Sequence, residues 1–253
     1  MSETAAFFHA LRFLTVLPVP RSEGLDADWL VRASKYFPAV GIIVGAVSAV
    51  VLLVASHWWI GFVPATLAVG ASALLTGALH EDGLADTADA LGGSSREARL
   101  AIMKDSRIGT YGALALGFTV LLRVAALSIL LPSVGAAALI ASHGGARAAA
   151  SLTMNALPYA GEVAAAKVSY SETRLDRSGV LVTIITALLA MIPMSMVSVR
   201  SVLVGVIVAS VLAALVAAAA RRLIGGYTGD ILGAVEQVCE VGILLGIAAG
   251  VPR

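Results

Sequence analysis

Four carboxylates lie within nine residues of the stretch HEDGLADTADALGG, residues 80–93. If this stretch forms a helix, Asp82, Asp86 and Asp89 stand at i, i+4 and i+7 and share one face. Like charges placed in this way repel one another, and a hard divalent cation such as Mg²⁺ turns the repulsion into binding. The pattern predicts an Mg²⁺ site at these three aspartates, with Glu81 as a further ligand. The open alternative is a solvated helix end whose acids favour the helix dipole.

Other metal and cofactor sites are excluded by the spacing of their usual ligands. A zinc-protease helix needs a second His four residues after the first, and the residue four after His80 is Leu84. Cys239 is the only cysteine, which excludes an internal disulfide and any cysteine-based zinc or iron–sulfur site. The sequence has neither a P-loop motif nor a Ser, His and Asp set for covalent catalysis. His80 itself either orients a carboxylate or faces the membrane interface.

A second polar cluster, IMKDSRIGTYG at residues 102–112, has the groups that a phosphate-bearing ligand needs. Lys104 and Arg107 supply cations, and Asp105 supplies a carboxylate. Ser106 offers a hydroxyl group, and the glycines that follow let backbone N–H groups approach a ligand. We therefore expect these four side chains to bind the substrate or its phosphate groups. The open alternative is a polar connector that re-enters the membrane, with Lys and Arg as interface anchors.

A third cluster, RRLIGGYTGDILGAVEQVCE at residues 221–240, joins a glycine-rich loop to the start of a helix. Asp230 is expected in the cap region of that helix and is a candidate catalytic carboxylate. Thr228 and Gly229 precede it and are candidate contacts for the substrate. The glycines do not form G-x-G-x-x-G after a strand, so a dinucleotide-binding fold is not indicated.

The composition places these clusters in a membrane protein. Of 253 residues, 59% are hydrophobic and 13% charged, about half the charged share of a soluble domain, and the mean hydropathy is +0.94. We predict a single domain over residues 1–253, an all-α polytopic integral membrane bundle with about seven transmembrane helices. The motif GIIVG, residues 41–45, offers a small-xxx-small surface for close helix packing. The predicted spans are residues 38–60, 63–80, 111–131, 134–157, 179–198, 202–220 and 237–252.

Basic residues predict the orientation of the bundle. Of 17 Lys and Arg residues, 13 fall on one side if the spans alternate, so that side and the N-terminus should be cytoplasmic. The acidic residues fall on the same side, so we expect the site on the cytoplasmic face of the inner membrane. The net charge is +1 and no basic stripe exists, so a nucleic-acid partner is not expected. The predicted cytoplasmic parts are residues 1–37, 81–110, 158–178 and 221–236.

Charged residues inside the predicted spans need partners, because an isolated charge in the bilayer is costly. Arg123 and Arg147 must each face a polar cavity or a carboxylate rather than lipid. Glu240 lies near membrane depth, on one helix face with Glu236, and needs a partner for the same reason. We assign Arg147 to the phosphate-binding site. Together the carboxylates, cations and glycines indicate metal-assisted phosphoryl transfer.

The three clusters resemble the signature blocks of the cobalamin-5′-phosphate synthase family, also called adenosylcobinamide-GDP ribazoletransferase. LRFLTVLPVP followed by SKYFPAVGIIVGAV is similar to the opening of that family, and GGARAAASLTMNALPYA is similar to its middle block. The resemblance is ordered and touches nearly the whole chain. It implies an enzyme of the cytoplasmic membrane that requires Mg²⁺. Its substrates would be adenosylcobinamide-GDP and α-ribazole or α-ribazole 5′-phosphate, and its products GMP and adenosylcobalamin or its phosphate.

The resemblance and the residues together predict a mechanism. The three aspartates of the first cluster hold Mg²⁺ against the diphosphate, and the ribose 3′-hydroxyl of α-ribazole attacks the phosphorus nearest the cobinamide. One of these aspartates, or Asp230, accepts the hydroxyl proton. Lys104, Arg107 and Arg147 bind phosphate oxygens. A homo-oligomer and contacts with other cobalamin-assembly enzymes stay open.

Two other functions are alternatives. A CDP-alcohol phosphotransferase has the pattern D-x-x-D-G-x-x-A-R, of which the chain shares Asp82-Gly83, but Leu79 stands at its first Asp position and Asp86 at its Ala position. A cation-coupled transporter, a different class, would place acids near the midplane and show an inverted repeat. The acids here lie on one side, and the blocks around 81–93 and 225–240 are not copies.

Overall fold

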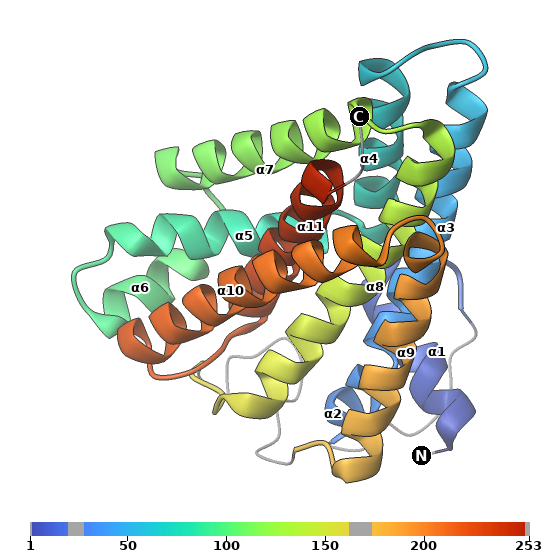
Figure 1. Ribbon diagram of the computed structural model, residues 1–253. Helices are drawn as coiled ribbons and strands as arrows, with labels where there is room; N and C mark the ends of the chain where they lie inside the picture. Colours follow the sequence, from blue (N-terminus) through green and yellow to red (C-terminus); the bar gives the residue numbers. More distant parts are fainter. Residues whose placement is uncertain (1, 20–27, 162–173, 251–253) are drawn as a thin grey trace.

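The computed structural model describes residues 2–19, 28–161 and 174–250, and these residues form helices and connecting segments without a β-strand (Figure 1). Parts of the predicted cytoplasmic segments 1–37 and 158–178 lie outside the described residues, as does the end of the predicted span 237–252. The helices are α1 (Glu3–Leu14), α2 (Trp29–Ser34), α3 (Phe37–Ala55), α4 (Phe62–Thr76), α5 (Leu79–Asp89), η1 (Ala90–Gly92), α6 (Arg96–Met103), α7 (Thr110–Ser128), α8 (Pro132–Ala156), α9 (Arg177–Ser195), α10 (Val199–Leu223) and α11 (Gly229–Gly250).

The predicted all-α polytopic membrane fold is confirmed. By length and composition, α3, α7, α9, α10 and α11 can each cross a membrane, and α4 with α5–η1 would make a sixth, bent span. Helix α8 covers the predicted span 134–157 but is not among them, because its middle carries polar residues, SHGGAR at 142–147. The count of seven spans and the side of the N-terminus therefore stay predictions.

The bend between α4 and α5 differs from the straight predicted span 63–80. Gly77 and Ala78 are both left-handed, with φ of 62° and 54°, and the chain turns by 90° between the two helices. The left-handed conformation is sterically unfavourable for alanine because of its Cβ, and glycine adopts it at little cost. Most of the segment 81–110, predicted as a cytoplasmic part that begins with a helix, is helical, and the bend gives α5 a direction different from that of α4.

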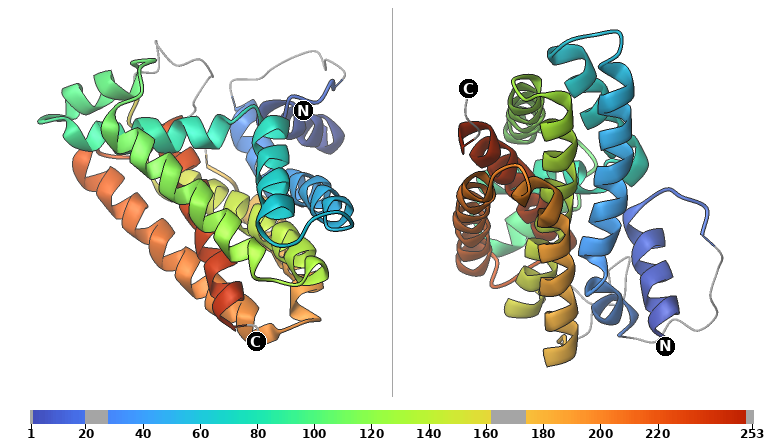
Figure 2. Two further views of the ribbon diagram at one scale, coloured as in Figure 1. Left: turned by 90° about the horizontal axis from the view of Figure 1, so that it is seen from above. Right: turned by 45° about the vertical axis from the view of Figure 1, so that its right-hand side comes forward.

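The helices form two arms. In Figure 1, α7 and α10 run in one direction and α3 and α9 in another, with α8 and α11 between them, and the views of Figure 2 agree. Helix α6, the start of α7 and the end of α10 gather at one side of this arrangement. Helix α11 packs against α10, α8, α5 and α7 and is buried over most of its length, so it is the central helix of the structure.

The predicted close packing through GIIVG is confirmed. Gly41 and Gly45 face the backbone of α8: a Cβ on Gly41 would collide with the carbonyl of His143, and one on Gly45 would lie 2.7 Å from the carbonyl oxygen of Leu139. The missing side chains let α3 and α8 approach closely over their length. This contact fixes the register of α8, which carries two of the buried polar side chains described below.

We expect Gly41→Ala to destabilise the protein by about 1–3 kcal/mol, because a methyl group there overpacks the α3–α8 contact. Gly70→Ala on α4 is the matched control, since a Cβ there meets no atom within 4 Å. Thermal unfolding in detergent, followed by tryptophan fluorescence, measures both. Equal melting temperatures for the two variants would contradict the close approach.

Candidate active site

Helix α5 carries the acidic motif, as predicted. Asp82 is exposed and Asp86 is half-buried, and the helix places them one turn apart on one face. The opposite side of α5 crosses α11 at glycines: a Cβ on Gly83 would lie 2.9 Å from the backbone oxygen of Asp230, and one on Gly233 3.1 Å from that of His80. The first and third sequence clusters therefore meet, and Asp230 starts α11 beside the acidic helix.

Asp89 joins the first cluster to the second. Its Oδ2 accepts a hydrogen bond of 2.7 Å from the backbone N–H of Gly109, and its Oδ1 accepts one of 2.9 Å from that of Gly112. These are N–H groups at the start of α7, which have no partner within that helix. A Cβ on either glycine would collide with the carboxylate. Asp89 thus holds the 105–112 segment on α5, and both of its oxygens are engaged in this way.

The second cluster borders a polar cavity of about 390 Å³. In it, Arg107 Nη2 lies 2.6 Å from Asp105 Oδ2, and this exposed ion pair lowers the pKa of Asp105 to about 2. Asp105 is therefore ionised at any physiological pH, and a phosphate must compete with it for Arg107. Lys104 and Ser106 are exposed on the same segment. The cavity is lined by Asp89, Ile102, Asp105, Arg107, Ile108 and Gly109.

The third cluster is a short loop that caps α11. The buried hydroxyl of Thr228 accepts a hydrogen bond of 3.3 Å from Ile231 N and donates one of 3.4 Å to Asp230 Oδ2. Gly229 is exposed at the first turn. Arg96, which sequence reasoning missed, fastens this loop from α6: its Nε donates to Ile224 O at 2.9 Å and its Nη2 to Ala160 O at 2.7 Å.

A buried network of charges lies beneath the motif. Arg123 is 1% exposed, and its Nη2 lies 2.7 Å from Glu240 Oε2. Its Nη1 lies 3.2 Å from Glu81 Oε1 and 3.1 Å from Gln237 Oε1. Ser72 of α4 accepts a further bond from Nη2 at 3.1 Å. One guanidinium therefore ties α7 to α4, α5 and α11, and the predicted need of Arg123 and Glu240 for partners is met.

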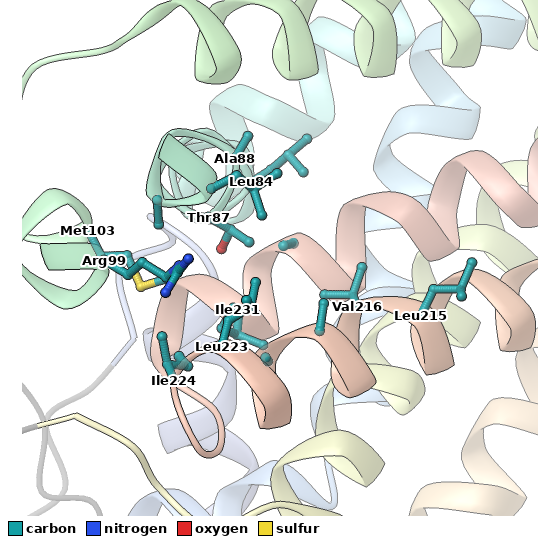
Figure 3. A pocket seen from close by; sticks show the side chains of 15 residues that line it. Leu84, Thr87, Ala88, Arg99, Met103, Leu215, Val216, Leu223, Ile224 and Ile231 are labelled. Atoms are coloured by element: carbon teal, nitrogen blue, oxygen red, sulfur yellow. The ribbon is translucent and has the colours of Figure 1, made fainter. Parts of the chain in front are cut away.

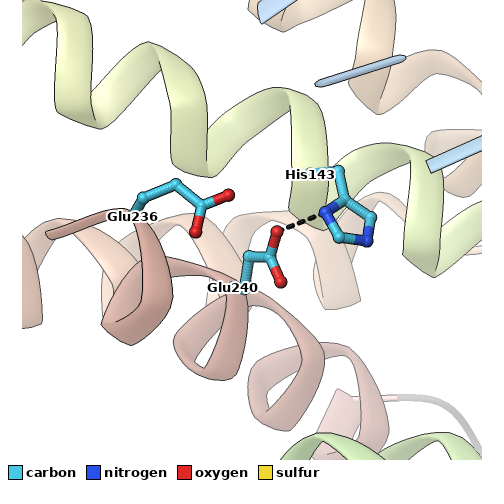
Figure 4. Close-up of side chains that lie close together, drawn as sticks. All are labelled: His143, Glu236 and Glu240. Carbon is cyan, nitrogen blue, oxygen red and sulfur yellow. Dashed lines mark ion pairs between the residues drawn. The ribbon is translucent and has the colours of Figure 1, made fainter. Parts of the chain in front are cut away.

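The second buried guanidinium belongs to Arg147 of α8. Its Nη1 lies 2.7 Å from Glu236 Oε1 and 3.3 Å from Glu240 Oε1. His143 Nδ1 pairs with the same oxygen of Glu240 (Figure 4). Both arginines thus face carboxylates rather than lipid, as their depth requires. The assignment of Arg147 to phosphate stays a prediction, and in this structure its partners are the glutamates of α11.

One group of three potential metal ligands stands out in the described parts of the chain, and it is not the acidic motif. The ligand atoms of His143, Glu236 and Glu240 lie within 4.8 Å of one another, and all three side chains are buried. Two guanidiniums already pair with these two carboxylates. A divalent cation would have to displace them, so we interpret the group as part of the charge network.

Comparison with known proteins identifies the chain. Residues 6–248 match the family model described as cobalamin-5-phosphate synthase. The chain belongs to this family. Similar relatives are the adenosylcobinamide-GDP ribazoletransferases of Leptothrix cholodnii, 41% identical over 98% of this chain and 97% of the relative, and of Azorhizobium caulinodans, 43% identical over 94% and 93%. The enzyme of that name from Shewanella oneidensis is 36% identical over 94% and 92%.

Membership of the cobalamin-5-phosphate synthase family confirms the predicted resemblance and makes the chain a transferase of cobalamin biosynthesis. The match spans all three sequence clusters, so the residues gathered at the α5–α11 crossing lie within the part common to the family. No solved structure matches the chain.

We expect Glu240→Ala to destabilise the protein by about 3–5 kcal/mol, because it leaves buried guanidinium groups without their carboxylate. Arg123→Met should cost a similar amount. The double variant should lose clearly less stability than the sum of the two single losses. Once one member of the ion pair is absent, removing the other no longer leaves that buried charge unpaired. Unfolding in detergent tests this cycle, and strict additivity would contradict the coupling.

We expect Asp89→Asn to loosen the 109–112 backbone, because an amide offers one acceptor oxygen where the carboxylate offers two. Amide hydrogen exchange of Gly109 and Gly112 should accelerate by about tenfold or more. Asp82→Asn, in the same helix but exposed, is the control and should leave both amides unchanged. Unchanged exchange in Asp89→Asn would remove Asp89 from this positioning role.

Proposed function

We propose that this chain joins adenosylcobinamide-GDP to α-ribazole or α-ribazole 5′-phosphate, with release of GMP, at the cytoplasmic face of the inner membrane. The names of the relatives support the substrates. The observation that carries the proposal is the convergence of the three polar clusters, which lie about 20 to 140 residues apart in sequence, around α5 and the start of α11. Carboxylates and cations at one end of a membrane bundle suit a diphosphate substrate.

The residues present fit Mg²⁺. Asp82, exposed, and Asp86, half-buried, offer oxygen ligands on one face of α5, and the ion needs only one or two carboxylates when substrate phosphates complete its shell. Glu81 Oε2 is a buried oxygen without a hydrogen-bond partner among the described residues. We assign Asp82 and Asp86 to the ion, while Asp89 holds the neighbouring loop and Glu81 pairs with Arg123. Bound there, Mg²⁺ would neutralise charge on the diphosphate.

The remaining steps belong to residues of the chain. The oxygen of the α-ribazole 3′-hydroxyl forms a bond to the phosphorus nearest the cobinamide, and the bond from that phosphorus to the GMP oxygen breaks. Asp230, at the first turn of α11 and beside α5, accepts the hydroxyl proton. Arg107, Lys104 and Ser106 bind phosphate oxygens from the 104–107 segment, and Arg107 leaves Asp105 to do so.

The reaction itself is tested with purified protein in liposomes, given adenosylcobinamide-GDP, α-ribazole 5′-phosphate and Mg²⁺. We expect equal amounts of GMP and corrinoid product by chromatography, and no product when EDTA removes the metal. CDP-alcohol substrates in parallel serve as the control for the alternative chemistry. Turnover that persists in EDTA would exclude the metal, and no corrinoid product would exclude the reaction.

Residue roles are tested by removing one charge at a time. We expect Asp82→Asn and Asp86→Asn to lower kcat on the order of a hundredfold and to raise the Mg²⁺ concentration needed for half-maximal rate. Glu97→Gln, an exposed acid on α6, is the control and should behave like the wild type. An Asp82→Asn enzyme with wild-type turnover and Mg²⁺ dependence would contradict the assignment of Asp82 to Mg²⁺.

A further inference from the structure

A second cavity lies on the side of α5 away from the aspartates. It has a volume of about 300 Å³, at the lower end of the range for small-molecule sites, and lies between α5, α6, α10 and α11 (Figure 3). Leu84 and Thr87 line it from α5, about half a turn of the helix away from Asp82 and Asp86. One helix thus presents carboxylates on one face and the wall of a cavity on the other.

The cavity is connected to the candidate active site through its walls. Ile231, one residue after Asp230, forms part of the lining, and so does Met103 of α6. The Sδ atom of Met103 lies 3.8 Å from Thr228 Oγ1, the hydroxyl that donates to Asp230 Oδ2. A molecule that occupies the cavity near Met103 therefore lies next to the carboxylate proposed to take the proton of the attacking hydroxyl.

The lining suits an uncharged, largely apolar molecule. Apart from Thr87 and Arg99, every lining residue has a hydrocarbon or thioether side chain, so the cavity cannot solvate a diphosphate. Thr87 Oγ1 and Arg99 Nε are buried without a hydrogen-bond partner among the described residues. In Figure 3 both side chains point toward the space between α5 and α10. Both polar atoms are shielded from the cavity itself, so the wall that a ligand would contact is almost entirely apolar.

We propose that this cavity binds the aromatic base of the α-ribazole substrate, which is a benzimidazole joined to ribose. This inference rests on the proposed function, which supplies α-ribazole as a substrate. The flat base fills the apolar part of the cavity, and the ribose extends past Met103 toward Thr228 and Asp230. A lipid acyl chain is the competing occupant, but it would place no hydroxyl group toward Thr228 and Asp230.

Filling the cavity tests the proposal. Ala219 of α10 lines it and is exposed, so Ala219→Phe should fold while blocking the space. We expect the KM for α-ribazole 5′-phosphate in liposomes to rise about tenfold or more, with the KM for adenosylcobinamide-GDP within about twofold of wild type. Ala214→Phe, exposed on another face of α10 and outside the lining, is the matched control. An unchanged KM for α-ribazole 5′-phosphate in Ala219→Phe overturns the proposal.

A binding measurement separates this inference from the proposed reaction. The fluorescence of α-ribazole, titrated with protein in nanodiscs and without the second substrate, should report binding to the wild type and Ala214→Phe but not to Ala219→Phe. Binding without turnover would leave the cavity assignment standing and overturn the proposed reaction. Turnover by the wild type, together with equal α-ribazole binding to Ala214→Phe and Ala219→Phe, would support the proposed reaction and overturn the cavity assignment.

A second variant guards against misfolding of the first. Val216→Phe narrows the cavity at a different lining position of α10, so α-ribazole should again bind about threefold to tenfold more weakly. Native mass spectrometry of the same samples identifies a competing lipid. A phospholipid that the wild type retains and Ala219→Phe loses, together with unchanged α-ribazole binding, would assign the cavity to an acyl chain and overturn the proposal.

Discussion

Two guanidiniums buried among membrane-spanning helices need carboxylates, and this requirement decides how α11 sits in the structure. Removing one partner of such a pair costs several kcal/mol, whereas a mismatched hydrophobic contact costs about one. Glu236 and Glu240 stand one turn apart on α11 and meet Arg147 of α8 and Arg123 of α7. The register of α11 against both helices is therefore set more sharply by charge than by its Ala, Val, Leu and Gly side chains. Glu81, paired with Arg123, extends the same constraint to α5.

The position of the candidate site follows from that constraint. Once α11 is held at depth, its first turn brings Asp230 against Gly83, where two helices meet without side chains between them. The hydrogen bonds of Asp89 then fix the 105–112 segment to α5. The hydrogen bond of Arg96 fixes the 224–228 loop to α6. Most of the groups that would touch the substrate are exposed or half-buried, while the arginines and glutamates that hold the helices together are buried. This division explains how a site on short segments stays ordered at the end of a bundle.

The sequence predicted the parts of the site better than their roles. Helical periodicity and composition were enough for the membrane fold, for the helix that carries Asp82 and Asp86, and for the rule that Arg123 and Arg147 must find carboxylates. The bend at Ala78 could not be predicted, since alanine favours helix continuation and the turn is imposed by tertiary contacts. Nor could the partners of Asp89 be read from spacing, because they are backbone N–H groups twenty residues away. The two glycines in IGTYG, Gly109 and Gly112, were the available indication in the sequence. They predicted that another group comes close to the backbone there, but not that this group is the Asp89 carboxylate.

The bend at Gly77–Ala78 also gives α5 its two faces. Had α4 continued straight, the acidic motif would have projected away from the bundle, with every side of the helix in the same environment. Turned by 90°, α5 lies along α7 and crosses the N-terminal part of α11, and it buries Leu84 and Ala85 while Asp82 stays exposed. Left-handed alanine costs about 1–2 kcal/mol, which the burial of one leucine side chain is enough to offset. A polar substrate can then be held on the exposed face and an apolar group behind the same helix. A helix with water on one side and the interior of a membrane bundle on the other satisfies both needs at once, which gives this chemistry a physical reason to take place at a membrane.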